Sequence, residues 1–168
     1  MTETTASSLM QTNSNTGTLH DYEIGIIGCG GIGSHLVGLA VPALHRGGLL
    51  ESTERITIRI YDSDEVSEEN LAHQRFMPDD VGKHKVTVIA ESMTPFTSER
   101  LRLVACPWDV RETSDMTPAD LTVVAVDSPV ARRVVHSSDT IFLDLRCLGD
   151  GYAALDSSVD PDFVIKMT

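Results

Sequence analysis

Apolar and polar positions along the chain follow two different periods, and together they predict alternating strands and helices. The apolar run Tyr22–Ile27 leads into a cluster of glycines, after which apolar side chains from Ile32 to Leu44 recur at helical spacing. This order predicts a strand, a tight turn and a helix. Pro42 lies inside the helical pattern, so we expect it to kink the helix or to end it early.

The rest of the chain repeats this alternation. Arg55–Asp62 alternates isoleucines with polar residues and predicts a second strand. A helix is expected to open at Asp79 or Asp80 and to run past Ile89, because either aspartate is a good N-cap. Further strands are expected at 100–106, 121–127 and 140–146, a helix at 129–136 and a last, antiparallel strand at 151–158. These elements predict an α/β fold: a doubly wound, Rossmann-like, mostly parallel sheet with helices on both faces, in three layers.

The chain divides into a polar start and one domain. Residues 1–20 are mostly small and polar, so we expect a disordered tail, because such residues bury too little apolar area to offset their ordering entropy. Residues 21–168 are then a single domain, and 168 residues with 41% hydrophobic side chains suffice for one sizeable core.

Charge and composition exclude several classes of partner. The formal net charge is −12, which disfavours nucleic acid and anionic lipid as partners, because phosphate polyanions need a basic face. No apolar stretch approaches the ~20 residues of a membrane span, and no secretory signal opens the sequence. Three widely spaced cysteines offer no disulfide framework. We therefore expect a cytoplasmic protein that does not use a membrane.

A glycine motif follows the first predicted strand. Gly28, Gly30 and Gly33 match G-x-G-x-x-G, with Gly31 inside the motif, and a helix is expected to begin here. Glycines let the backbone approach a phosphate, and a helix N-terminus offers free N–H groups. The alternative is a tight turn without a ligand. Asp62 ends the second strand, where this layout places an acid against ribose hydroxyls, so NAD, FAD and ATP all remain open.

The segment after the second strand resembles the ThiF/MoeB/ubiquitin-activating (E1-like) family. That family carries D-x-D-x-V-x-x-x-N-L-x-R-Q and then D-x-G-x-x-K-(A/V). The matching positions are Asp62, Asp64, Val66, Asn70, Leu71, Gln74, Gly82 and Lys85. Further on, "VAVDSPVARR" is similar to the family's strand-end aspartate and the arginine after it, which match Asp127 and Arg132.

The resemblance implies an activity and a set of roles. Family members use Mg-ATP to adenylate the C-terminal carboxylate of a ubiquitin-like or sulfur-carrier protein and release pyrophosphate. Carried onto this chain, the glycines shape the phosphate turn, Lys85 stabilises the transition state, and Asp127 holds Mg²⁺. The other implied nucleotide contacts are Asp62 at the ribose, Asn70 and Arg75 at phosphates, and Asp64, His73, Gln74 and Arg132.

These residue types suit that reaction. A C-terminal carboxyl group has a pKa of about 3.5 and is already ionised, so its attack on the α-phosphorus needs no general base. The site needs only to position the reactants and to neutralise charge. Each residue also has an ordinary explanation: Lys85 as a solvated helix lysine, Asp127 as an N-cap and Asn70 as a turn residue.

The chain departs from the family pattern in ways that leave alternatives open. His73 stands where the family has an arginine, and no arginine precedes Arg46, although family dimers pass an N-terminal arginine into the neighbouring site. Family members also continue further and often bear a thioester or persulfide cysteine; Cys147 is the one late cysteine here. We therefore expect a homodimer or a complementing subunit. A catalytically weak partner subunit is the first alternative, and an NAD(P)-dependent oxidoreductase is the second.

Overall fold

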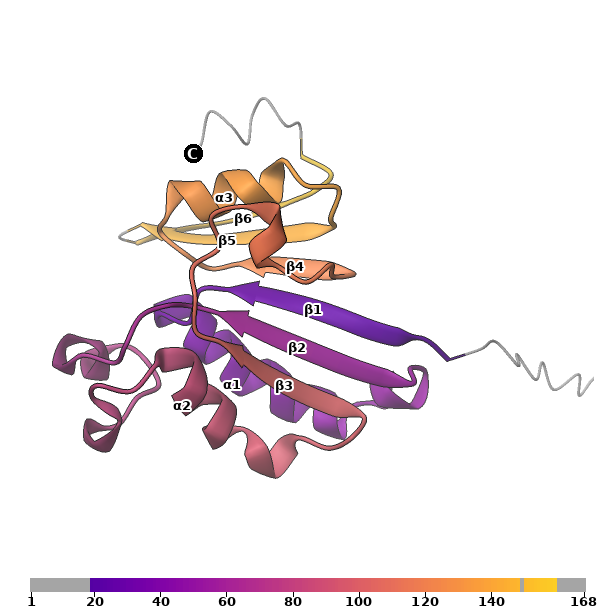
Figure 1. Ribbon diagram of the computed structural model, residues 1–168, viewed down its shortest axis with the longest axis horizontal. Coiled ribbons are helices and arrows are strands. Elements are labelled where there is room, and N and C mark those ends of the chain that lie inside the picture. The colour runs from indigo at the N-terminus through magenta and orange to yellow at the C-terminus, as the bar shows by residue number, and fades with distance from the viewer. Residues whose placement is uncertain (1–18, 149, 160–168) are drawn as a thin grey trace, which may run out of the picture.

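The computed structural model describes residues 19–148 and 150–159 and forms one six-stranded sheet there (Figure 1). The strand order is β3-β2-β1-β4-β5-β6. Strands β1 to β5 are parallel, and β6 pairs antiparallel with β5. The strands are β1 (Asp21–Ile27), β2 (Arg55–Tyr61), β3 (Leu101–Cys106), β4 (Leu121–Val124), β5 (Phe142–Leu148) and β6 (Gly151–Asp156).

Helices cover both faces of the sheet, which confirms the predicted three-layer arrangement. The α-helices are α1 (Gly31–Arg46), α2 (Lys85–Ser92) and α3 (Pro129–His136). Short 3₁₀ turns are η1 (Gly48–Glu51), η2 (Glu68–Ala72), η3 (Pro78–Asp80), η4 (Thr94–Phe96) and η5 (Thr113–Asp115). In Figure 1, α1 and α2 lie along β1 to β3, and α3 lies beside β4 and β5.

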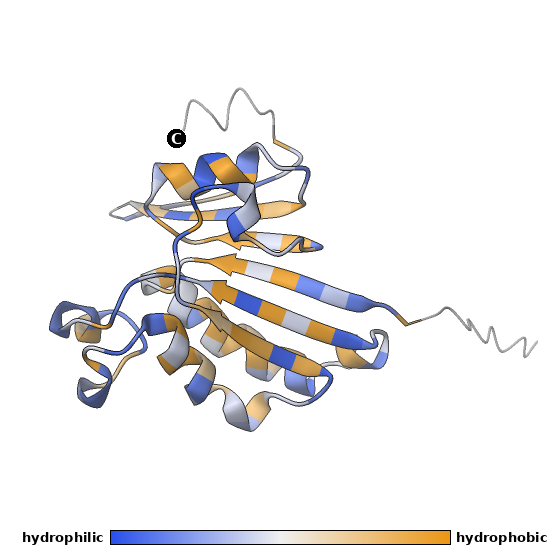
Figure 2. Cartoon of the chain, in the orientation of Figure 1, coloured by the Kyte–Doolittle hydropathy of each residue, from blue (hydrophilic) through white to orange (hydrophobic). Residues whose placement is uncertain are grey.

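The apolar core is divided by the sheet into two clusters. Successive strand side chains point to opposite faces, so Ile26 packs with α1 and α2 whereas Ile27 packs with α3. Ile56, Ile58 and Ile60 all belong to the cluster under α1 and α2, and each is at most 1% exposed. The orange strand positions in Figure 2 trace this buried layer. The alternation in the sequence is therefore the direct cause of how the sheet is covered.

The chain reverses its winding between β1 and β4. From β1 the chain moves outward through β2 and β3, and it then returns to β4 on the other side of β1. Because β-α-β crossovers are right-handed, the helices of the two halves lie on opposite faces. In open α/β sheets, ligands bind outside the carboxyl ends of the strands at such a switch point. The fold thus directs attention to the ends of β1, β2 and β4.

Several boundary predictions are wrong. The second helix begins at Lys85 and not at Asp79 or Asp80, because the Asp80 carboxylate accepts a bond from the Met77 N–H (2.9 Å) and closes η3 instead. Gly82 then takes a positive φ of 85° and breaks the helical path. The fourth strand ends at Val124 and the fifth begins at Phe142.

Other predictions are confirmed or fall outside the structure. Helix α3 has the predicted bounds, and β6 is antiparallel as expected. Helix α1 continues through Pro42 to Arg46, so the proline does not end it early. The tail expected at 1–20 lies almost entirely outside the described residues. No helix in the described part of the chain has the length and apolar character needed to cross a membrane.

Candidate nucleotide site

The turn after β1 depends on two glycines. Gly28 has a φ of +97°, and a Cβ there would lie 2.6 Å from the Ala125 carbonyl oxygen, so no other residue fits. Gly33 lies one turn into α1, and a Cβ there would collide with the Gly28 carbonyl oxygen. The Gly28 N–H donates to the Tyr61 carbonyl oxygen (2.8 Å), which ties the turn to the end of β2. These contacts bring the start of α1 close to the sheet edge.

The N-terminus of α1 is open. Gly30 is its N-cap, no side chain caps the first turn, and no acidic residue lies there. A Cβ on Gly31 would meet no atom within 4 Å, so there is free space beside the backbone. Unpaired N–H groups and the positive end of the helix dipole therefore face an empty volume, which is the usual arrangement for binding phosphate.

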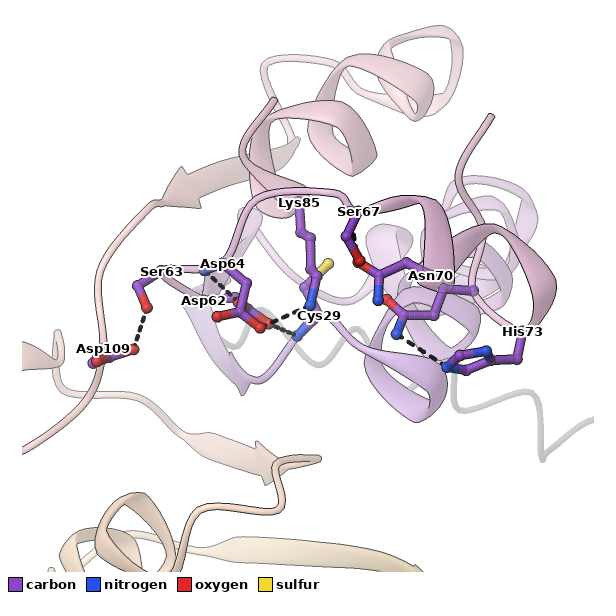
Figure 3. Close-up of polar contacts among 10 residues, drawn as sticks. Cys29, Asp62, Ser63, Asp64, Ser67, Asn70, His73, Lys85 and Asp109 are labelled. Carbon is purple, nitrogen blue, oxygen red and sulfur yellow. Dashed lines mark hydrogen bonds and ion pairs between the residues drawn. The ribbon is translucent and has the colours of Figure 1, made fainter. Parts of the chain in front are cut away.

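Asp62 links the glycine turn to the segment after β2 (Figure 3). One of its carboxylate oxygens accepts from the Cys29 N–H (2.6 Å) and the other from the Asp64 N–H (2.8 Å). Burial raises the pKa of the Asp62 carboxyl group, although both hydrogen bonds act to lower it. Each oxygen keeps a second lone pair, so Asp62 can still accept a hydrogen bond from a ribose hydroxyl at the cavity.

Lys85 carries a buried positive charge. Its side chain is 7% exposed, and its Nζ lies 2.8 Å from an oxygen of Asp64, whose side chain is 66% exposed. The Lys85 backbone N–H also donates to the Asp64 carbonyl oxygen (3.0 Å), so the two residues are joined through their backbones as well as through their side chains. Figure 3 shows Lys85, Asp64 and Asp62 next to Cys29. Helix α2 thereby delivers one ammonium group to the base of the glycine turn.

Most of the predicted residues share one cavity of about 720 Å³. This volume lies within the ~300–1,000 Å³ of small-molecule sites. The predicted residues among its lining are Gly28, Gly30, Gly31, Asp62, Asp64, His73, Gln74, Lys85 and Asp127. The residues come from the ends of β1, β2 and β4, from the start of α1, from the segment after η2 and from the start of α2, so the cavity lies at the switch point of the sheet.

Gln74 has an unmet hydrogen-bonding group at this cavity. Its Oε1 is buried and has no partner in the described part of the chain. Its Nε2 lies 3.4 Å from the His73 ring and about 4 Å from where a Cβ on Gly30 would lie. The two ends of an amide can exchange places, so the side chain can present a donor or an acceptor to a ligand. An unpaired amide atom on a residue that lines the cavity beside Gly30 fits a polar ligand such as a nucleotide.

Four predicted residues do not line the cavity, and each has another contact. Gly33 packs on Gly28. The Asn70 amide oxygen accepts from the Ser67 N–H (3.0 Å) and caps η2. Arg75 lies across Gly38 of α1, and Arg132 donates to the Val126 carbonyl oxygen. The structure therefore places these residues around the site and not in it.

Asp127 lies in the turn after β4 and lines the cavity. Among residues 19–148 and 150–159, no three His, Cys, Asp or Glu side chains gather into a ready-made metal site. A Mg²⁺ ion needs no such group, because it commonly takes one or two carboxylates together with substrate phosphates and water. A single carboxylate in the same cavity as an uncapped helix N-terminus fits that requirement.

Part of the cavity lining has no counterpart among the predicted site residues. Asp109, Val110 and Arg111 line it, together with Ser128, Val130, Ala131 and Cys147. Asp109 accepts a bond from the Ser63 hydroxyl and another from the Arg111 guanidinium (2.8 Å), and these bonds lower the pKa of the Asp109 carboxyl group. No motif marks these residues. The signal was positional, since Asp109 follows the carboxyl end of β3, where open α/β sheets bind ligands.

The sequence profile of the ThiF family matches residues 6–156. The chain belongs to the ThiF family. The family assignment accords with the Rossmann-like fold and with the motif residues that meet at the cavity. No curated protein sequence is significantly similar to this chain.

Solved structures of larger proteins are similar to this domain. E. coli MccB with AMPCPP and MccA is 26% identical, with a TM-score of 0.59. The alignment covers 77% of this chain and 38% of MccB. MccB with ATP is 25% identical, with the same TM-score and coverages. PaaA is 19% identical, with a TM-score of 0.55 over 76% of this chain and 38% of PaaA, which shows a shared fold alone. The chain thus spans well under half the length of these proteins.

Proposed function

We propose that this domain binds Mg-ATP in the cavity and adenylates the C-terminal carboxylate of a ubiquitin-like protein, a sulfur carrier or a shorter peptide. The carrying observation is Lys85: an almost fully buried ammonium group beside an uncapped helix N-terminus, in the same cavity as Asp127. A triphosphate would supply negative charge to Lys85 and to the helix N-terminus, where Asp64 is paired with Lys85 and Asp62 also interacts with it.

The residues support each step of the reaction. The carboxylate oxygen of the acceptor attacks the α-phosphorus of ATP, and the bond from that phosphorus to the bridging oxygen of the β-phosphate breaks. Pyrophosphate carries away the electron pair, and no proton has to move because the acceptor is already ionised. Lys85 and the N–H groups of α1 stabilise the charge that develops on the phosphates. Mg²⁺, held by Asp127, would neutralise further phosphate charge.

The comparisons support ATP and a peptide as substrates. MccB has been solved with ATP and with MccA, and a further structure describes it as a microcin C7 biosynthetic enzyme in complex with N-formylated MccA. By likeness, the acceptor here would offer its C-terminus to the open side of the cavity. The family assignment and Lys85 favour this activity over an NAD(P)-dependent oxidoreductase. The homodimer and the cytoplasmic location expected from the sequence stay predictions.

His73 favours a second candidate, a catalytically weak partner subunit. It lines the cavity where the family motif has an arginine, and a neutral imidazole does not grip a phosphate as a guanidinium does. Arg75, two residues later, lies against α1 and outside the cavity lining, so it does not replace that charge from its present position. This candidate predicts nucleotide binding without turnover.

ATP–pyrophosphate exchange separates the two candidates. We expect the wild type to exchange labelled pyrophosphate into ATP only when a suitable carrier C-terminus and Mg²⁺ are present. Lys85→Ala and Asp127→Ala should each lower the exchange rate at least about 100-fold, in line with the loss of an electrostatic catalytic group. Lys83→Ala, which removes an exposed lysine two residues away, is the matched control. If the protein binds Mg-ATP but exchanges no pyrophosphate with any carrier tested, the second candidate, a catalytically weak partner subunit, is favoured.

A further inference from the structure

We propose that Asp144 is a positioning residue for the nucleotide site: through Arg132, it fixes the turn 125–128 that carries Asp127. The inference rests on the proposed function, because it assigns a role at the same cavity. Neither the sequence motifs nor the cavity lining includes Asp144. Its role follows from the contacts that connect the middle of β5 to the end of β4.

Asp144 is a fully buried carboxylate surrounded by basic side chains. It is 0% exposed and lies opposite Val124, the last residue of β4. Arg146 donates two bonds to one of its oxygens (2.7 and 3.0 Å), and the His136 Nε2 lies 3.0 Å from the same oxygen. The other oxygen lies 3.4 Å from the Arg132 Nε. A buried charge is tolerated only with such partners, so the cluster acts as a unit.

Arg132 connects this cluster to the cavity wall. Its Nε faces Asp144 while its Nη2 donates to the Val126 carbonyl oxygen. Val126 and Asp127 both line the cavity. The guanidinium therefore pairs with Asp144 by charge, since the Arg132 Nε and the facing Asp144 oxygen make no hydrogen bond within the described residues, and it donates a hydrogen bond to Val126. A lysine ammonium on a flexible stem would not keep both contacts in fixed directions. One side chain therefore joins the buried carboxylate of β5 to the residue next to the proposed magnesium ligand.

The turn needs this support because the sheet no longer holds it. The pairing of β4 with β5 ends at Val124, and the Ala125 N–H makes the last bond to β1, with the Ile27 carbonyl oxygen (2.8 Å). Beyond Ala125, the Arg132 contact fixes the Val126 carbonyl group before α3 begins at Pro129. The ion pair with Asp144 thus holds Arg132 against the backbone of this turn.

Two kinds of measurement test this role, using Asp144→Asn, Arg132→Lys and, as a matched control, the exposed Asp139→Asn. First, hydrogen exchange of the unliganded protein follows the peptide 125–131. We expect exchange there to quicken by about tenfold in both cluster variants, as a lost hydrogen bond would allow, and to stay unchanged in the control. Unchanged exchange at 125–131 in folded Asp144→Asn and in Arg132→Lys would overturn the proposal.

Second, the Mg²⁺ concentration that half-saturates ATP binding reports the position of Asp127. We expect it to rise by about fivefold or more in both cluster variants, while ATP binding in EDTA changes less than about twofold. A merely structural defect would lower the melting temperature and weaken both forms of binding alike, which would contradict a positioning role. If the wild type shows no binding of Mg-ATP, the proposed function fails, and the exchange result alone decides the role of Asp144.

Arg132→Lys keeps the experiment decisive if Asp144→Asn does not fold. It retains the positive charge that balances Asp144 but loses the fixed second donor to Val126. Normal exchange at 125–131 and a normal Mg²⁺ requirement in this variant would overturn the bridging role of Arg132 and, with it, the inference.

Discussion

Gly28 is a residue whose replacement the fold tolerates poorly. Its φ of +97° and the 2.6 Å approach to the Ala125 carbonyl oxygen leave no room for a side chain. We expect Gly28→Ala to lower the free energy of unfolding by about 2 kcal/mol or more, since both strain and a backbone clash result. Urea unfolding measures the change.

Gly48→Ala is the control for that experiment. A Cβ on Gly48 would meet no atom within 4 Å, and this residue opens η1 far from the glycine turn. Its unfolding free energy should stay within about 0.5 kcal/mol of the wild type. Equal effects of the two substitutions would show that the Gly28 turn is not constrained as described.

The cysteines should differ sharply in reactivity. Burial, with the neighbouring Asp62 carboxylate, raises the pKa of Cys29 to about 12, and burial also raises the pKa of Cys106. Cys147 is exposed at the cavity. Because the thiolate is the reactive form, iodoacetamide at about pH 8 should label Cys147 first. Peptide mass spectrometry would follow the labelling, and early modification of Cys29 in folded protein would contradict this burial.

Bound nucleotide should alter that labelling. Cys147 lines the same cavity as Lys85 and Asp127, so we expect Mg-ATP to slow its alkylation by at least about threefold at a saturating concentration. Cys147→Ser, followed for loss of the labelled peptide, identifies the site of modification. An unchanged rate with bound ATP would mean that the nucleotide does not reach the β5 end of the cavity.

His136 of helix α3 should make the free energy of unfolding fall at acid pH. Burial is the main cause that lowers the pKa of His136, and it outweighs the nearby Asp144 carboxylate; Arg146 and Arg132 act in the same direction as burial. Between the lowered pKa and the ordinary value of about 6.5, the unfolded state binds a proton that the folded state does not. This contribution to stability is therefore complete above the ordinary value and is lost as the pH falls.

The substitution His136→Gln tests the direction of this change of stability with pH. The wild type should lose more unfolding free energy than His136→Gln when the pH is lowered from about 7.5 to about 5.5, because only the wild type loses the His136 contribution. Chemical denaturation at each pH gives the comparison, and His35→Gln, on the exposed side of α1, is the control. A steeper loss in His136→Gln would contradict the direction of the shift.

At the scale of elements, hydrophobic periodicity predicted most of the strands and helices. The errors were confined to the ends of a few elements. The isoleucine alternation of β2 and the bounds of α3 were predicted because one buried face dictates the pattern. The start of α2 was missed because Asp80 caps a 3₁₀ turn and Gly82 takes a positive φ, a choice between two local caps that the sequence leaves open. The start of this helix therefore depends on a single hydrogen bond, from the Met77 N–H to Asp80, and on the backbone conformation of Gly82.

The site was predicted in its motif residues but not in its supporting contacts. Lys85, Asp62 and Asp127 meet at the cavity, as a strand-end layout requires. Arg132 was expected at the nucleotide, yet it faces Asp144, a residue 12 positions later that no local pattern connects to it. Such pairings arise only when α3 packs on β5, so a linear reading does not reveal them.

At the scale of the whole molecule, charge is distributed unevenly between surface and site. The chain carries a formal net charge of −12, and the cavity lining also includes four aspartates, so a buried lysine and an open helix N-terminus are the local groups that can attract an anion there. We infer that binding of a polyanion here depends on these local groups and not on long-range attraction. ATP affinity should therefore fall only modestly with added salt, whereas loss of Lys85 should reduce it strongly.

Mg-ATP binding by this cavity is the central claim, and thermal unfolding with and without ligand tests it most directly. The wild type, Lys85→Ala and the control Lys83→Ala would each be melted with Mg-ATP, with ATP in EDTA and with NAD. At a hundred times its dissociation constant a ligand stabilises by about 2.7 kcal/mol, several degrees for a domain of this size. We expect Mg-ATP to stabilise the wild type and Lys83→Ala by that amount and Lys85→Ala hardly at all. Stabilisation by NAD alone, or equal stabilisation of Lys85→Ala by Mg-ATP, would contradict the account.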